Sequence, residues 1–135
     1  HIFYKERWYG FDDGLYSAAR LLEIISLDNR STEQIFAAFS VGHATPELSI
    51  SVTEESKNAI IEHLKTTARW GGAKVTTLDG IRVDYQNSWG LIRPSNTTPT
   101  LVLRFEGDTE LDLQKIMQLF RIQLKNAKPD LPWPF

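Results

Sequence analysis

The sequence contains no cysteine, and no apolar run approaches the roughly 18 to 20 residues that a membrane-spanning helix needs. The absence of cysteine excludes disulfides, cysteine-based zinc sites and thiol catalysis, and it agrees with a reducing compartment. The first residues, His1 to Arg7, do not resemble a signal peptide. We therefore expect a soluble, cytoplasmic protein without a membrane partner.

An excess of either charge is also missing. The chain has 15 basic and 17 acidic residues, dispersed along its length, for a net charge of -2. Dispersed charge provides no basic field of the kind that wraps nucleic acid, although a local cationic pocket could still bind an anion. What the 135 residues do have is 41% hydrophobic residues, which is enough for the core of one domain, or of one domain with a remnant of another.

The first third of the sequence predicts a strand followed by two helices. Residues 2–4 form a short apolar run that is typical of a strand. Apolar residues recur at spacings of three and four over residues 15–25, which predicts an amphipathic helix. A second helix is expected to begin at Ser31, which can form a capping box, and to end near Ser40.

Residues 41–46 contain a glycine and a proline without any periodicity, so we expect a linker there and divide the chain into domains 1–44 and 45–135. The second domain is expected to be α+β, with a first strand followed by a four-stranded antiparallel sheet that has two helices on one face. An Asp79-Gly80 turn predicts a tight hairpin within it. The expected strands are 47–52, 74–78, 81–85, 89–92 and 100–105, and the expected helices are 54–70 and 109–126.

The segment Arg93-Pro94-Ser95-Asn96-Thr97-Thr98-Pro99, between the last two expected strands, combines a guanidinium, three hydroxyls and an amide. Its two prolines limit its flexibility. Arginine presents a planar fork of donors to phosphate oxygens, and hydroxyl and backbone N–H groups can add charge-assisted bonds. From chemistry alone, a plain polar turn is the favoured interpretation and an anion site is the alternative.

Four segments carry a resemblance to a known family. Residues 1–14, 77–85, 89–93 and 95–99 resemble the C-terminal part of bacterial phosphomannomutase/phosphoglucomutase, in the alpha-D-phosphohexomutase superfamily. The resemblance covers essentially the whole chain. It implies that the first expected domain is the end of the family's α/β domain three, a strand-helix-helix remnant, and that the second is domain four.

Domain four of that family is a mobile cap with a fold like that of the TATA-binding protein. Its Arg-x-Ser-Asn-Thr loop holds the phosphate that is not reacting. The resemblance therefore implies that a phosphate is bound by Arg93, Ser95, Asn96, Thr97 and Thr98.

The resemblance also implies the reaction of a longer enzyme. This enzyme interconverts the 1-phosphate and 6-phosphate of mannose or glucose through a phosphoserine and a bisphosphorylated sugar, with Mg²⁺ and hexose 1,6-bisphosphate as cofactors. His1 resembles an active-site histidine that could shuttle a proton near the reacting phosphate. Thr45 and Pro46 lie in the segment that resembles the family hinge. The phosphoserine and the Mg²⁺ loop would lie outside this chain, so we expect the fragment to be inactive alone and to bind no cofactor.

Other interpretations stay open. A stand-alone module of the same fold that binds nucleic acid or protein would need basic or aromatic residues lining its sheet. Asp12 and Asp13 could bind a metal, but capping of the following helix explains them with fewer assumptions. His43 and His63 have no partners at metal-ligand spacing, so we interpret both as surface residues.

Overall fold

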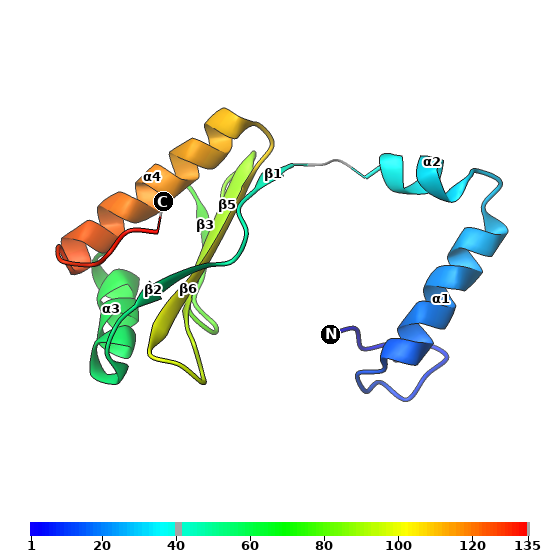
Figure 1. Cartoon of the computed structure of the whole chain (residues 1–135), viewed down its shortest axis with the longest axis horizontal. Coiled ribbons are helices and arrows are strands. Elements are labelled where there is room, and N and C mark those ends of the chain that lie inside the picture. Colours follow the sequence, from blue (N-terminus) through cyan, green and yellow to red (C-terminus); the bar gives the residue numbers. More distant parts are fainter. Residues whose placement is uncertain (40–41, 135) are drawn as a thin grey trace. The chain divides into compact units, whose positions relative to one another are not determined.

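The computed structural model describes residues 1–39 and 42–134, and the chain divides into two compact units, His1–Val41 (unit 1) and Gly42–Phe135 (unit 2) (Figure 1). This division falls a few residues before the predicted domain boundary. Ser40, where the second helix was expected to end, and Val41, where the predicted linker begins, lie outside the described residues.

Unit 1 contains two helices that begin at local caps. α1 (Gly14–Leu27) follows Asp13, whose carboxylate accepts a hydrogen bond of 2.9 Å from the backbone N–H three residues on. α2 (Thr32–Ala37) begins with the predicted capping box, in which the side chains of Ser31 and Gln34 accept from each other's backbone N–H. Short-range hydrogen bonds therefore start both helices.

The prediction of a strand at residues 2–4 is wrong. Phe3 makes one isolated antiparallel bridge to Asp12, and the described part of unit 1 contains no strand. A strand needs a neighbour whose N–H and C=O groups continue the ladder, and this unit provides one at a single position. The apolar run at residues 2–4 indicates extended backbone, but it does not show whether a second strand is present to pair with it.

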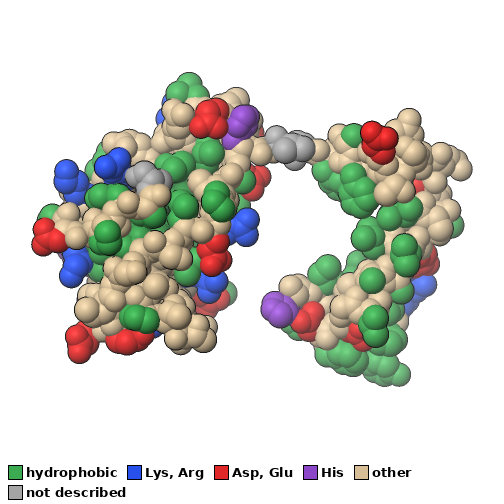
Figure 2. Space-filling model, in the orientation of Figure 1, with side chains coloured by type: hydrophobic (Ala, Val, Ile, Leu, Met, Phe, Trp, Pro, Cys, Tyr) green, Lys and Arg blue, Asp and Glu red, His purple; other side chains and the backbone are tan. Residues whose placement is uncertain are grey.

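α1 leaves its apolar side uncovered. None of its residues is buried, and Leu15, Leu22 and Leu27 are 87%, 66% and 77% exposed. Figure 2 shows hydrophobic side chains spread over the surface of this unit. An amphipathic helix in a protein is stabilised mainly by packing of its apolar face, so unit 1 lacks the contacts that its sequence pattern predicts.

Unit 2 contains an antiparallel sheet in the order β1-β6-β5-β4-β3, and β2 also pairs with β6 (Figure 1). The longest pairing joins β5 to β6 and runs from Ser88 opposite Gly107 to Pro94 opposite Leu101. The strands are β1 (His43–Ala44), β2 (Leu48–Ser51), β3 (Lys74–Thr76), β4 (Ile81–Asp84), β5 (Ser88–Pro94) and β6 (Thr100–Gly107).

Two helices, α3 (Glu54–Thr67) and α4 (Glu110–Ala127), cover one face of this sheet. Thr53 and Thr109 cap them, and each threonine hydroxyl accepts a hydrogen bond of 3.2 Å from the N–H three residues on. Acidic residues in the first turn of both helices suit the positive end of the helix dipole.

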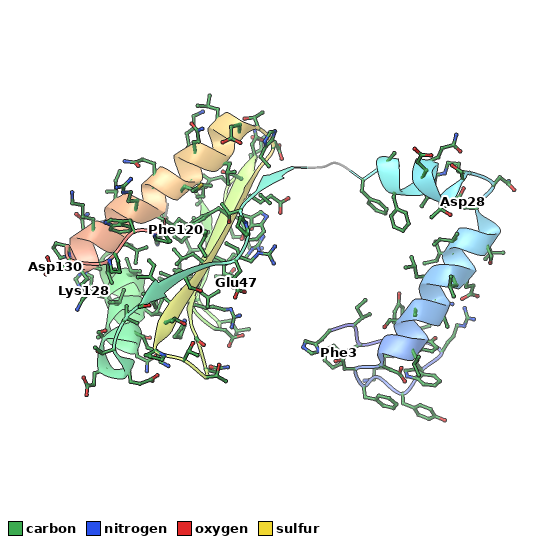
Figure 3. All side chains as sticks on the ribbon, in the orientation of Figure 1. Phe3, Asp28, Glu47, Phe120, Lys128 and Asp130 are labelled. Atoms are coloured by element: carbon green, nitrogen blue, oxygen red, sulfur yellow. The ribbon has the colours of Figure 1, made fainter. Side chains whose placement is uncertain are left out.

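The core of unit 2 lies between the sheet and these helices. Phe120 projects from α4 toward the sheet (Figure 3) and packs edge-on against Phe105, with ring centroids 5.1 Å apart. Gly90 makes room for the ring, because a Cβ there would lie 2.5 Å from a Phe120 carbon. The fully buried side chains are Phe105, Phe120, Ile50, Leu64, Ile81, Ile92, Leu101, Leu103, Leu124 and Val83.

The predicted α+β fold, with an antiparallel sheet and both helices on one face, is confirmed. Among the described residues the sheet has six strands rather than the predicted four, because the strand predicted before those four (β2) and the unpredicted β1 both pair with β6. Pro46 lies in the interruption between them and has no N–H to donate to the ladder. In the described parts of the chain, no helix is long and apolar enough to cross a membrane.

Candidate functional site

The loop predicted to bind an anion joins β5 to β6 and is closed by backbone hydrogen bonds. The Ser95 N–H donates to the Thr100 carbonyl at 2.9 Å, and the Thr100 N–H donates to the Thr98 carbonyl at 2.8 Å. Pro94 and Pro99 flank the segment and restrict its backbone. The loop is therefore a defined turn at one end of the sheet.

The Ser95 hydroxyl organises the inside of the loop. Its Oγ accepts hydrogen bonds from the N–H groups of Thr97 and Thr98, at 3.4 and 3.3 Å, and from the Thr98 hydroxyl at 2.8 Å. Both N–H bonds are longer than the roughly 2.7–3.2 Å that is usual for such bonds. Two backbone donors thus converge on one oxygen position without binding it strongly.

Arg93 brings a cation to the same end of the sheet. Its side chain is half-buried, and its guanidinium makes no hydrogen bond or ion pair within the described parts of the chain. By contrast, Arg82 on the neighbouring strand β4 pairs with Asp84 at 2.7 Å and lies over the Trp89 ring. The unpaired guanidinium of Arg93 has its donors available for an anion.

A cavity of about 560 Å³ lies beside Arg93 and Asn96. Its other walls come from α3, which contributes Lys65, and from the turn between β3 and β4. Gly80 in this turn has a φ of +150°, and a Cβ there would lie 2.2 Å from the Ile92 carbonyl oxygen. Glycine therefore allows the connection between β3 and β4 to lie against β5, next to Arg93. This connection spans residues 77–80, so it is longer than the predicted tight turn of Asp79 and Gly80.

Lys57 is a residue of this site that the sequence analysis did not identify. It is buried on α3, and its Nζ donates to the carbonyl oxygens of Ser95 and Thr98 and to the Glu54 carboxylate. The helical periodicity of the sequence could have identified Lys57. Position 57 lies two turns before the buried Leu64 and therefore on the same face of α3. A lysine on an apolar helical face indicates a buried, paired ammonium.

His1 and the acidic pair that follows it belong to unit 1. The His1 Nδ1 bonds to the Asp12 carboxylate, while Asp13 caps α1, so the two acids have separate structural partners. A bond at Nδ1 holds the ring and leaves Nε2 for other contacts. Within residues 1–39 and 42–134, no cluster of three or more His, Asp or Glu side chains could hold a metal ion.

The predicted hinge residues lie at the edge of the sheet in unit 2. The Thr45 N–H donates to the Phe105 carbonyl at 3.0 Å, and the Thr45 hydroxyl accepts from the Phe105 N–H at 3.2 Å. Pro46 follows directly. Any bending at this point would have to break these bonds, and a hinge role for Thr45 and Pro46 stays a prediction.

Comparison with known families identifies residues 47–123 as a match to "Phosphoglucomutase/phosphomannomutase, C-terminal domain". The match covers more than half of the chain and includes both α3 and the loop. The chain belongs to the phosphoglucomutase/phosphomannomutase family. This membership confirms the resemblance predicted from the sequence segments.

Members of the phosphoglucomutase/phosphomannomutase family match this chain over its full length. A phosphomannomutase/phosphoglucomutase of Pseudomonas aeruginosa (strain PAO1) is 61% identical over 135 residues, which cover 100% of this chain and 29% of the relative. A phosphoglucomutase of Neisseria gonorrhoeae is 46% identical, over 99% of this chain and 29% of the relative. The solved structure of a family protein from Burkholderia thailandensis has a TM-score of 0.87 at 43% identity and covers 100% of this chain. The chain spans 28% of that structure, so it accounts for less than a third of each of these family members.

Proposed function

We propose that this chain is the phosphate-binding C-terminal part of a longer phosphohexomutase, which interconverts the 1-phosphate and 6-phosphate of glucose or mannose. The observation that carries the proposal is the unpaired, half-buried Arg93 beside the cavity, together with two backbone N–H groups of the same loop that converge on a weakly held position. The names of the relatives support a hexose phosphate as the ligand.

Each group of the loop has a role in holding the phosphate. The Arg93 guanidinium offers a planar pair of donors to two phosphate oxygens. The Ser95 hydroxyl can rotate so that a phosphate oxygen takes its place in front of the Thr97 and Thr98 N–H groups. The Asn96 amide and the Thr98 hydroxyl add further donors. Each charge-assisted bond contributes on the order of 1.5–3 kcal/mol.

Recognition of phosphate rather than sugar suits a mutase. In the proposed reaction a phosphoserine donates its phosphoryl group, and a bisphosphorylated sugar turns over between two half-reactions. The idle phosphate is therefore on C6 in one half-reaction and on C1 in the other. A loop that binds only phosphate accepts both orientations and positions the opposite end for in-line transfer. Closure of the cap would exclude water that could hydrolyse the phosphoserine.

The reacting groups are proposed to lie in the part of the longer enzyme that this chain does not span. They are the phosphoserine, the Mg²⁺ loop and the residues that distinguish sugars, with hexose 1,6-bisphosphate as the activating cofactor. His1, with its ring held by Asp12, would act beside the reacting phosphate. We expect the longer enzyme in the cytoplasm, and we expect no mutase activity from the 135-residue chain alone.

Titration of the ¹⁵N-labelled chain with glucose 1-phosphate tests the proposed role of the loop. Saturable shifts of the amide signals of Arg93 and of residues 95–98 are expected, with inorganic phosphate as a competitor. Arg93→Ala should abolish them, because it removes the only charged side chain of the loop. Arg104→Ala, which removes an exposed arginine of β6, is the matched control and should leave them in place.

Two results would contradict the proposal. One is equal shifts in the Arg93→Ala variant and the wild type. The other is a response of the same signals to a single-stranded oligonucleotide and none to the sugar phosphate, which would favour the alternative of a nucleic-acid-binding module.

A further inference from the structure

Lys57 ties α3 to the phosphate loop through its ammonium group. Nζ donates to the Ser95 carbonyl at 2.8 Å, to the Thr98 carbonyl at 3.3 Å and to the Glu54 carboxylate at 2.8 Å. An ammonium has three N–H donors, and these three acceptors use all of them. Lys57 is 6% exposed and is the one buried polar or charged residue in the described parts of the chain.

The loop carbonyls distinguish Lys57 from an ordinary helical ion pair. On the same helix, Lys65 pairs with Glu62 at the same i,i+3 spacing and at 2.8 Å, but it is exposed and donates to no loop carbonyl. Burial of an ammonium is costly unless all of its donors are satisfied. An ion pair with Glu54 could form on the exposed face of α3, so the burial of Lys57 follows from its bonds to the loop.

These bonds also set the direction of a loop donor. The Ser95 carbonyl shares a peptide unit with the Asn96 N–H, and no peptide bond of the described residues is cis. In a trans peptide the C=O and N–H point in opposite directions, so the Asn96 N–H points away from the Lys57 ammonium. The hydrogen bond from Lys57 to the Thr98 carbonyl fixes the other end of the segment 95–98. A loop that offers N–H groups to an anion needs donors for the carbonyls on its opposite side, and Lys57 supplies them.

We propose that Lys57 is a positioning residue for phosphate binding. It acts through the loop backbone, which it holds in the conformation that presents the Asn96 N–H beside Arg93. This inference rests on the proposed phosphate-binding function of the loop, and it adds that the function depends on a buried ammonium of α3.

Lys57→Met tests the proposal, because methionine keeps the four-atom stem of lysine and removes only the ammonium. In the glucose 1-phosphate titration of the 135-residue chain, we expect the variant to bind about 10-fold more weakly, as for the loss of one charge-assisted hydrogen bond. Amide signals of Ser95, Asn96 and Thr98 should shift even without ligand. Lys115→Met removes the lysine of an i,i+3 pair on α4 and should bind within about two-fold of wild type.

The absence of cysteine makes a chemical rescue specific to one site. A Lys57→Cys variant, alkylated with 2-bromoethylamine while unfolded and then refolded, regains an ammonium at the original distance from the backbone. Alkylation with iodoethane restores only the stem. We expect the aminoethyl form alone to recover phosphate affinity. Equal affinity of the two forms would mean that the stem acts by packing, and would overturn the positioning role.

The outcomes separate this inference from the function on which it rests. Binding by wild type with unchanged affinity in Lys57→Met overturns the positioning role and leaves phosphate binding intact. Absence of binding by wild type contradicts the proposed function itself, and the positioning role falls with it. If every variant without the ammonium fails to fold, a measurement on the wild type tests the positioning role instead. The Lys57 ammonium signal of the wild type should shift when phosphate saturates the loop, and an unchanged signal overturns the proposal.

Discussion

The helices of the two units differ greatly in how much of their apolar faces is buried. In unit 2, α3 and α4 bury their apolar faces against the sheet, whereas α1 of unit 1 has no buried residue. Unit 1 also holds both of the buried side-chain nitrogens that lack a hydrogen-bond partner among the described residues, Trp8 Nε1 and Arg20 Nε. The same local rules therefore produce helices packed on a core in unit 2 and, in unit 1, the helix α1 without any buried residue.

This difference shows that helix formation and core formation have separate causes. Caps such as Asp13 and Ser31 start helices from neighbouring residues alone. Burial needs a second surface, and in unit 2 the sheet provides one. Because the relatives are much longer than this chain, we expect the surface that covers α1 to belong to the rest of the proposed longer enzyme.

Two leucines on helices of the two units provide the strongest test of this comparison. Leu124 on α4 is fully buried, so Leu124→Ala should lower the free energy of unfolding by about 2–5 kcal/mol. Leu15 on α1 is 87% exposed, so Leu15→Ala should change it by less than about 0.5 kcal/mol. Urea unfolding followed by circular dichroism measures both. Equal losses would contradict the contrast between the units.

The helix caps should give a smaller effect. Thr109→Ala removes the hydroxyl that accepts the Asp112 N–H and should destabilise unit 2 by about 1 kcal/mol. Asp13→Ala should reduce the helical chemical shifts of α1 without moving the unfolding midpoint of unit 2, because the hydrogen bond that it removes lies within unit 1. A common shift of both units would show that they unfold as one.

The smallest predicted effect is on the pKa of Asp28, which forms an ion pair with Arg30 directly after α1. Hydrogen bonds from the Arg30 side chain and then from its backbone lower the pKa of Asp28 from 3.8 to about 2. Because folding lowers this pKa, the stabilisation is present above pH 3.8 and is lost as the pH falls through about 2. A carboxyl ¹³C titration should show a low pKa of Asp28 in wild type and a higher one in Arg30→Ala, which keeps only the hydrogen bond from the backbone N–H of residue 30. An ordinary pKa in wild type would mean that the contact does not persist in solution.

Features that depend on neighbouring residues could be predicted from the sequence. The capping box at Ser31 and the apolar face of α4 are local patterns, and the loop that we propose to bind phosphate is contiguous from Arg93 to Thr98. The division of the edge strand into β1 and β2 was missed, because it depends on how each piece pairs with β6. Lys57 was missed for the same kind of reason, since its loop partners lie 38 and 41 residues further along the chain.

Catalytic efficiency of the longer enzyme tests most directly whether the loop holds the substrate phosphate. With Arg93→Ala, kcat/KM for glucose 1-phosphate should fall by an amount equivalent to about 2–5 kcal/mol of transition-state binding. Arg104→Ala in the same enzyme should stay close to wild type. An unchanged kcat/KM in the Arg93→Ala enzyme would contradict the phosphate-binding role of the loop.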